Sequence, residues 1–145
     1  MRALGIDLGS KRIGVATSDR SGTIATPLTV LQRSGSRETD YRAISELVTE
    51  YEIECVVVGL PLHMNGTHGD AAKSAVAEVQ QLTNVLSVPV LTFDERRTTV
   101  TADSILMEQN MNAQERRKVI DKVAAAVMLQ SWLDGRKMTE TSSRD

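Results

Sequence analysis

Hydrophobic and polar positions follow two different periods in two parts of the chain. Before residue 32 the pattern is that of extended structure, with largely apolar runs at 3–8, 13–18 and 23–31 separated by short polar turns. Strands joined this tightly form an antiparallel meander, because parallel neighbours need a long crossover. Pro27 in the third run lacks an amide hydrogen, which places that strand at an edge of the sheet.

After a polar loop the period becomes helical, and helices alternate with two apolar strands. The predicted helices cover about 38–51, 70–84, Thr98 or Thr99 to about 109, and 114–134, and the predicted strands cover 54–60 and 88–93. Strands that alternate with helices form a parallel sheet with helices on its faces, and right-handed crossovers place the strand at 54–60 beside the first strand. The sequence therefore predicts an α/β fold with a mixed five-stranded sheet, three antiparallel strands and then two parallel ones, covered by helices on both faces.

The length and composition are those of one globular domain. The chain has 145 residues, of which 41% are hydrophobic and 25% charged, so it can bury a substantial core. We expect the domain to cover residues 1–136 and a flexible tail without apolar periodicity to cover 137–145. No apolar run approaches the roughly 18 residues of a membrane span, and a carboxylate stands too close to the first residue for a signal peptide. These features predict a cytoplasmic protein without a membrane partner.

The charge balance excludes a domain that attracts nucleic acid through a strongly basic overall field. Lys and Arg number 17 against 19 Asp and Glu, which gives a net charge of -2. A phosphate-bearing partner would therefore be held by local basic clusters or through a metal ion. The short basic clusters are Lys11-Arg12, Arg96-Arg97 and Arg116-Arg117-Lys118.

Two carboxylates interrupt apolar patterns at distant points of the chain. Asp7 lies in the first strand, where an unpartnered charge is costly to bury, so a lysine, backbone amides or a metal ion must compensate it. Asp121 shares one stripe of the last helix with Ala125 and Met128, which places it toward the sheet rather than toward solvent. The small side chains at 124–126 would let this helix approach the sheet closely.

A third acidic position follows the strand at 88–93. Asp94 and Glu95 stand where a parallel strand ends, which is the edge at which α/β sheets bind ligands. Successive strand side chains point to opposite faces, so only one of these two carboxylates can enter a shared site. The other is expected to cap a turn or to pair with an arginine, and the residues alone leave both assignments open.

Carboxylates from three parts of the chain form an oxygen-rich site of the kind that holds Mg²⁺ or Mn²⁺. His63 and His68, in the glycine-rich loop at 61–69, have no third nitrogen or sulfur ligand nearby, so we expect them to face substrate or to serve the structure. Two divalent ions about 3.5–4 Å apart can activate a water and stabilise the leaving oxygen of a phosphodiester. The acidic positions therefore point to metal-dependent hydrolysis of phosphodiester bonds.

Four motifs stand in order between residues 3 and 133. They are GIDLGSKRIGVA at 5–16, VGLPL at 58–62 with NGT at 65–67, DER at 94–96 with TT at 98–99, and DKVAA at 121–125. Together they resemble the YqgF family, the RuvX-type branch of the ribonuclease H-like nucleases. The resemblance covers most of the chain, and its specificity lies in the combination of the four motifs.

The resemblance implies a ribonuclease H-like fold, in agreement with the order of elements above. It implies that Asp7, Glu95 and Asp121 are the catalytic acidic triad that holds Mg²⁺ or Mn²⁺, which favours Glu95 over Asp94. It also implies substrate contacts, and the matching positions are Lys11, Arg12, Asn65, Arg96 and Thr98. Members of the family are described as nucleases that process the 5′ end of pre-16S rRNA in ribosome biogenesis, and an older description is Holliday junction resolvase.

The chain departs from the family pattern at three positions without losing a carboxylate. Leu8 stands where proline is usual, His63 where asparagine is common, and Arg97 where leucine is often found. Arg97 adds positive charge near the site, which would influence substrate preference.

Three alternatives stay open beside a pre-rRNA nuclease. A Holliday junction resolvase would act on branched DNA and would need a dimer with paired sites. The oligomeric state, monomer or homodimer, therefore distinguishes the resolvase from the pre-rRNA nuclease. A non-catalytic RNA-binding factor in ribosome assembly would keep the acidic site for stability. An actin-like sugar kinase shares the first motif, but it needs a second lobe for which this chain has no room. Ribosomal particles, rather than free RNA, are a further possible partner.

Overall fold

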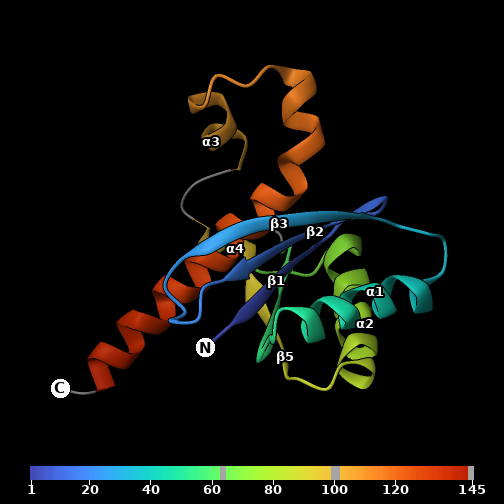
Figure 1. Ribbon diagram of the computed structural model, residues 1–145, viewed down its shortest axis with the longest axis vertical. Helices are drawn as coiled ribbons and strands as arrows, with labels where there is room; N and C mark the ends of the chain where they lie inside the picture. The colour runs from blue at the N-terminus through green and yellow to red at the C-terminus, as the bar shows by residue number, and fades with distance from the viewer. Residues whose placement is uncertain (63–64, 99–101, 144–145) are drawn as a thin grey trace.

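A mixed five-stranded sheet forms the centre of the computed structural model, which describes residues 1–62, 65–98 and 102–143 (Figure 1). The strands are β1 (Ala3–Leu8), β2 (Arg12–Ser18), β3 (Ala25–Gln32), β4 (Cys55–Leu60) and β5 (Val90–Asp94). They lie in the order β3-β2-β1-β4-β5. The pairs β1–β2 and β2–β3 are antiparallel, whereas β1–β4 and β4–β5 are parallel. The predicted sheet is confirmed, including the edge position of the strand that contains Pro27.

Helices cover both faces of the sheet, as the sequence predicts. They are α1 (Arg37–Glu50), α2 (Asp70–Val85), α3 (Ala102–Glu108) and α4 (Ala113–Ser143), with one turn of 3₁₀ helix, η1 (Glu95–Arg97), directly after β5. α1 and α2 pack on one face, and α4 crosses the other face over β1, β2 and β3 (Figure 1). α3 packs against α4, and together with the start of α4 it extends beyond the sheet (Figure 1).

Alternate side chains along the strands form two cores of different character. The core under α1 and α2 contains large side chains, among them Leu4, Ile6, Ile44 and Leu82. The core under α4 contains many small ones, among them Ala3, Ala16, Ala125 and Ala126. A Cβ added to Gly14 in β2 would overlap the main chain of Asp121 in α4. Small residues on both partners therefore let α4 lie directly on the sheet, with Asp121 against β2.

β3 begins two residues later than the sequence pattern predicts. It starts at Ala25 rather than at 23, because the amides of Thr23 and Ile24 donate hydrogen bonds to Oδ1 of Asp19 at 2.7 and 3.2 Å. These bonds hold the two residues in the turn between β2 and β3, so their amides are not available to the sheet ladder.

The predicted end of the last helix near 134 is wrong, since α4 continues to Ser143. No proline follows residue 89, and one glycine at 135 costs a helix only about 1 kcal/mol. The domain bounds and the flexibility of residues 137–145 stay predictions. Thr98 does not begin α3 but closes η1, and Thr99 lies outside the described residues. Among the helices described, none has both the length and the apolar character needed to span a bilayer.

Candidate active site

Two acidic side chains meet where the parallel strands end. Asp7 lies near the end of β1, and Glu95 begins η1 directly after β5. The carboxylate of Glu95 lies over Gly59 of β4, since a Cβ on that glycine would be 2.5 Å from its Oε1 and 3.1 Å from its Cδ. Any side chain at position 59 would therefore displace the Glu95 carboxylate from its place over β4.

The alternation of side chains along β5 separates Asp94 from Glu95. Phe93 packs into the core under α4, and Glu95, two residues further on, follows the same side. Asp94 instead caps η1 by accepting a hydrogen bond from the amide of Arg96 at 3.0 Å, and it pairs with the Arg96 guanidinium at 2.5 Å. The structure thus groups Glu95 with Asp7, and the chemical roles of both stay predictions.

Asp121 approaches the same region from α4. Its charge contributes to the raised pKa of Asp7, so the two carboxylates are electrostatically coupled. Its own Oδ2 accepts a hydrogen bond from Nε of Arg12 at 2.8 Å, in an ion pair whose side chains are 23% and 44% exposed, respectively. Asp121 is therefore compensated by an arginine from β2, whereas Asp7 is not.

The unpaired carboxylates, Asp7 and Glu95, hold their protons unusually tightly. Burial raises the pKa of Asp7 from 3.8 to about 6, and the charge of Asp121 adds to the effect. Burial raises the pKa of Glu95 from 4.5 to about 7, with further contributions from the charges of Asp7 and Asp94. Within the described residues neither carboxylate pairs with a cation, so their negative charges are held in place at a cost in free energy. Such perturbed groups at a strand-end site are typical of functional positions.

These carboxylates have the donor chemistry that Mg²⁺ and Mn²⁺ prefer. No three Asp, Glu, His or Cys side chains in the described part of the chain stand close enough together to form a ready-made metal site. In this arrangement Asp121 is paired with Arg12, which leaves two carboxylates, Asp7 and Glu95, without a cation. The half-buried pair without a cationic partner therefore has the oxygen donors that fit a divalent cation.

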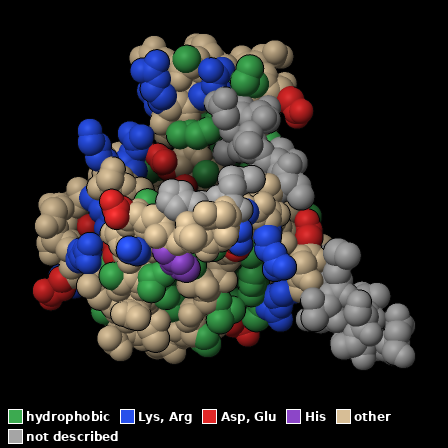
Figure 2. Space-filling view, turned by 180° about the vertical axis from the view of Figure 1, so that it is seen from behind, with side chains coloured by type: hydrophobic (Ala, Val, Ile, Leu, Met, Phe, Trp, Pro, Cys, Tyr) green, Lys and Arg blue, Asp and Glu red, His purple; other side chains and the backbone are tan. Residues whose placement is uncertain are grey.

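Basic side chains stand at the margin of the site. Figure 2 shows acidic side chains recessed below the upper part of the molecule, which α3 and the start of α4 form, with Lys and Arg side chains beside them. Lys11 is exposed in the turn between β1 and β2, next to Arg12. Thr98 is half-buried, and its amide donates a hydrogen bond to the carbonyl of Glu95 at 3.1 Å. Arg12 therefore contacts the site from β2 through Asp121, Lys11 precedes it in the turn, and Thr98 belongs to the turn that holds Glu95.

The loop after β4 lies against η1. The guanidinium of Arg96 is 3.3 Å from where a Cβ of Gly66 would be, so this loop glycine packs directly on the arginine. Asn65 shapes the same loop, because its Oδ1 accepts hydrogen bonds from the amide and hydroxyl of Thr67 at 3.0 and 2.7 Å. His63 lies outside the described residues, and His68 is exposed. Asn65, through its neighbour Gly66, and Arg96 thus lie on one border of the site, next to Glu95.

Sequence reasoning missed two glycines that position the acidic groups. Gly14 admits the main chain of Asp121, and Gly59 admits the side chain of Glu95. A glycine inside an apolar strand marks a close approach of another group, and that was the available signal. What approaches each glycine is decided by residues far away in the chain.

Known proteins resemble this chain over nearly its whole length. A family model described as RuvX, Holliday junction resolvase, matches residues 1–135. A protein of Thermoanaerobacter pseudethanolicus named "Putative pre-16S rRNA nuclease" is 44% identical, over 94% of this chain and 99% of its own length. A protein of Caldanaerobacter subterraneus with the same name is 47% identical, over 94% and 99% of the two chains.

Solved structures add a likeness in fold. Thermus thermophilus RuvC in complex with a Holliday junction substrate superposes with a TM-score of 0.63 and 18% sequence identity, covering 96% of this chain and 97% of the RuvC chain. A second structure of the same RuvC superposes with a TM-score of 0.57. The ribonuclease H-like fold predicted from the sequence is therefore confirmed.

Proposed function

The chain belongs to the RuvX family, and we propose that it is a metal-dependent nuclease that hydrolyses phosphodiester bonds at the 5′ end of pre-16S rRNA. The observation that carries the chemistry is the pair of half-buried carboxylates, Asp7 and Glu95, which have raised pKa values and no cationic partner among the described residues. The names of the relatives support the choice of substrate.

Asp7, Glu95 and Asp121 would hold Mg²⁺ or Mn²⁺. Such ions would supply Lewis acidity at the scissile phosphate and would lower the pKa of a bound water. Asp7 is coupled to both other carboxylates, which supports a central position for it. Glu95 is held over Gly59 and Asp121 over Gly14, so each approaches Asp7 from a different element.

Arg12 would change partners when substrate binds. It now neutralises Asp121, and it would become free to bind a phosphate of the substrate once Asp121 joins the metal site. Lys11, next to Arg12, and Arg96, next to Glu95, would supply further positive charge, and Asn65 and Thr98 would supply polar groups near Arg96 and Glu95. All five residues are proposed substrate contacts.

The near-neutral charge supports a large partner in addition to free RNA. With a net charge of -2, the chain lacks the strong field that would hold long RNA by itself. We therefore propose that a pre-ribosomal particle presents the RNA 5′ end, and that the reaction takes place in the cytoplasm.

Cleavage of a 5′-labelled precursor RNA tests the function directly. The parent protein should cut it with Mn²⁺ or Mg²⁺ and not with EDTA. Asp7→Asn should reduce the rate about 100-fold or more, because even the loss of a group that only orients a metal ligand costs about 10- to 100-fold. Asp19→Asn is the matched control, because Asp19 is an exposed carboxylate in the turn between β2 and β3. Cleavage by Asp7→Asn at the parental rate would show that the acidic pair is not the reaction centre. In cells that carry only Asp7→Asn, unprocessed 16S 5′ ends should accumulate.

A Holliday junction resolvase is the second candidate, because the family model carries that description. Symmetric cutting of a four-way junction needs two sites related by a dimer axis. A parallel assay with a junction of the same strand length, together with the mass of the protein in solution, separates the two functions. A dimer that cuts the junction and leaves precursor RNA intact would favour the resolvase.

A further inference from the structure

A groove of about 740 Å³ runs beside the acidic pair. α4 covers mainly β1, β2 and β3, with few contacts to β4, so it leaves space beside β5 at the edge of the sheet. The groove fills this space, with β5 and the end of β4 along one side and the later turns of α4 along the other. Phe93, on the same side of β5 as Glu95, and Leu60, which follows the Gly59 that Glu95 covers, both line the groove, so one end of it lies close to Glu95.

Aromatic and cationic side chains line this groove. The chain has one tryptophan and one phenylalanine, and both Trp132 and Phe93 line it. Arg97, Arg136 and His68 contribute positive charge or hydrogen-bond donors. Figure 2 shows hydrophobic side chains beside a column of Lys and Arg side chains on one face of the molecule. Asp94, the acidic residue of the lining, already pairs with Arg96, so the groove is locally cationic in a chain whose net charge is -2.

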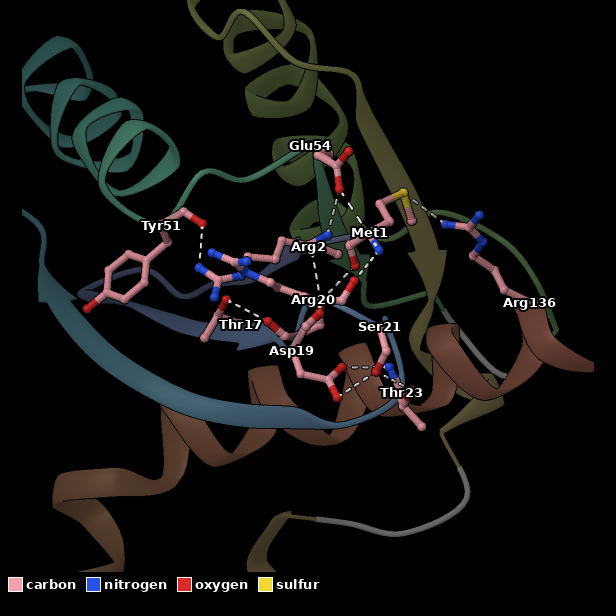
Figure 3. A network of polar contacts seen from close by, with 12 residues as sticks. Met1, Arg2, Thr17, Asp19, Arg20, Ser21, Thr23, Tyr51, Glu54 and Arg136 are labelled. Carbon is pink, nitrogen blue, oxygen red and sulfur yellow. Dashed lines mark hydrogen bonds and ion pairs between the residues drawn. The ribbon is translucent and has the colours of Figure 1, made fainter.

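Arg136 is oriented by its neighbours. Its guanidinium carbon lies 4.9 Å from the centroid of the Trp132 ring, in a cation–π contact. Its Nη1 donates to Sδ of Met1 at 3.3 Å, and Figure 3 shows the side chain directed from α4 toward the start of β1. The two contacts hold the guanidinium at the groove wall, so little side-chain entropy is lost when it binds an anion.

We propose that this groove binds unpaired nucleotides of a single-stranded nucleic acid that leads into the acidic pair, an inference that rests on the proposed nuclease function. Bases stack in the aromatic lining formed by Phe93 and Trp132, and Arg97 and Arg136 bind backbone phosphates. Stacking of this kind favours single strands, because the bases of a duplex already stack on one another. Arg97 is exposed and lines the groove, so its guanidinium is accessible to a phosphate there.

Trp132 is the only tryptophan, so the intrinsic fluorescence of the whole protein reports on this groove. In EDTA, titration with a single-stranded RNA of about 12 nucleotides should quench this fluorescence to saturation. A blunt duplex of the same sequence should leave it nearly unchanged. Equal quenching by the duplex, or RNA binding seen by anisotropy without any change at Trp132, overturns the proposal.

Two variants that each remove one positive charge test the phosphate contacts. Arg97→Gln and Arg136→Gln should each weaken single-strand binding about 5- to 10-fold, and each should reduce the slope of log Kd against log salt concentration by about 0.7. Arg42→Gln is the control, because Arg42 is exposed on α1, where it pairs with Glu38 of the same helix. α1 lies on the face of the sheet opposite the groove. If Arg42→Gln weakens binding as much as the groove variants do, general electrostatics explains the binding and the groove does not.

Failure of the groove and failure of the nuclease function give different results. If RNA quenches Trp132 fluorescence in EDTA and the Arg97 and Arg136 variants bind it more weakly, but no RNA is cleaved in Mn²⁺, nucleotide binding in the groove is supported and the nuclease function is refuted. Suppose instead that RNA is cleaved in Mn²⁺, that Trp132 fluorescence does not change, and that both groove variants bind RNA like the parent. That result would support the nuclease function and refute nucleotide binding in the groove.

Discussion

Replacing Asp7 by asparagine should make the metal-free protein more stable above pH 6. The substitution keeps the size of the side chain and removes a buried negative charge from the end of β1. Because the folded-state pKa of Asp7 is raised, the fold favours its neutral form. The favourable contribution is complete below the unfolded pKa of 3.8 and is lost as the pH rises through about 6. Asparagine stays neutral at every pH and avoids that loss.

The size of the effect follows from the two pKa values. A rise from 3.8 to about 6 corresponds to about 3 kcal/mol of unfolding free energy at neutral pH. For a chain of this length that is an increase in Tm of roughly 6–12 °C. The difference between Asp7→Asn and the parent should therefore be near zero at pH 4 and reach its full size by pH 7.

Thermal and urea unfolding in EDTA across this pH range measure the difference. Asp19→Asn is a control of opposite sign, because hydrogen bonds from the amides of Thr23 and Ile24 and the hydroxyl of Ser21 lower the pKa of Asp19 to about 2. Figure 3 shows Asp19 beside Ser21 and Thr23. That variant should be less stable than the parent at neutral pH. Excess Mg²⁺ should raise the Tm of the parent and have little effect on Asp7→Asn. A stability gain that does not vary with pH, or a net loss, would refute the account of Asp7 as an uncompensated buried charge.

Further predictions concern packing at the site and a buried ion pair. Gly59→Ala should reduce cleavage at least 10-fold with little change in Tm, because the atoms nearest the new Cβ belong to the Glu95 side chain, which can turn away, and not to the main chain. Gly14→Ala should instead lower the free energy of unfolding by about 1–3 kcal/mol, because its Cβ meets the main chain of α4; equal Tm values for the two variants would contradict this reasoning. Glu78→Gln should cost about 3 kcal/mol in urea unfolding, because Glu78 is 3% exposed and binds Arg33 through two hydrogen bonds of 2.7 and 2.8 Å. Burial raises the pKa of Glu78, but the hydrogen bonds from Arg33 and Tyr41 outweigh burial and hold it below 4.5, so this contribution should be complete above pH 4.5 and lost on acidification.

The order of elements, the two faces of the sheet and the burial of Asp7 follow from the sequence by itself. Periodicity is a local property, and each strand or helix records in its own residues which side it buries. Pro27 marks an edge strand for the same kind of reason, since a missing amide hydrogen can be recognised without knowing the neighbours. The end of α4 could not be predicted from local sequence, because no helix breaker follows the point where its apolar stripe stops.

Tertiary structure alone decided how the acidic groups are partnered. Arg12 and Asp121 are 109 residues apart, and nothing local predicts that they pair. The grouping of Glu95 with Asp7, which the residues themselves left open, depends on the alternation of β5 and on the space above Gly59 in a neighbouring strand. The groove beside them exists because α4 stops short of β5. Each of these features is a distance between segments that are remote in the chain, and such distances are set only when the whole sheet and its helices pack together.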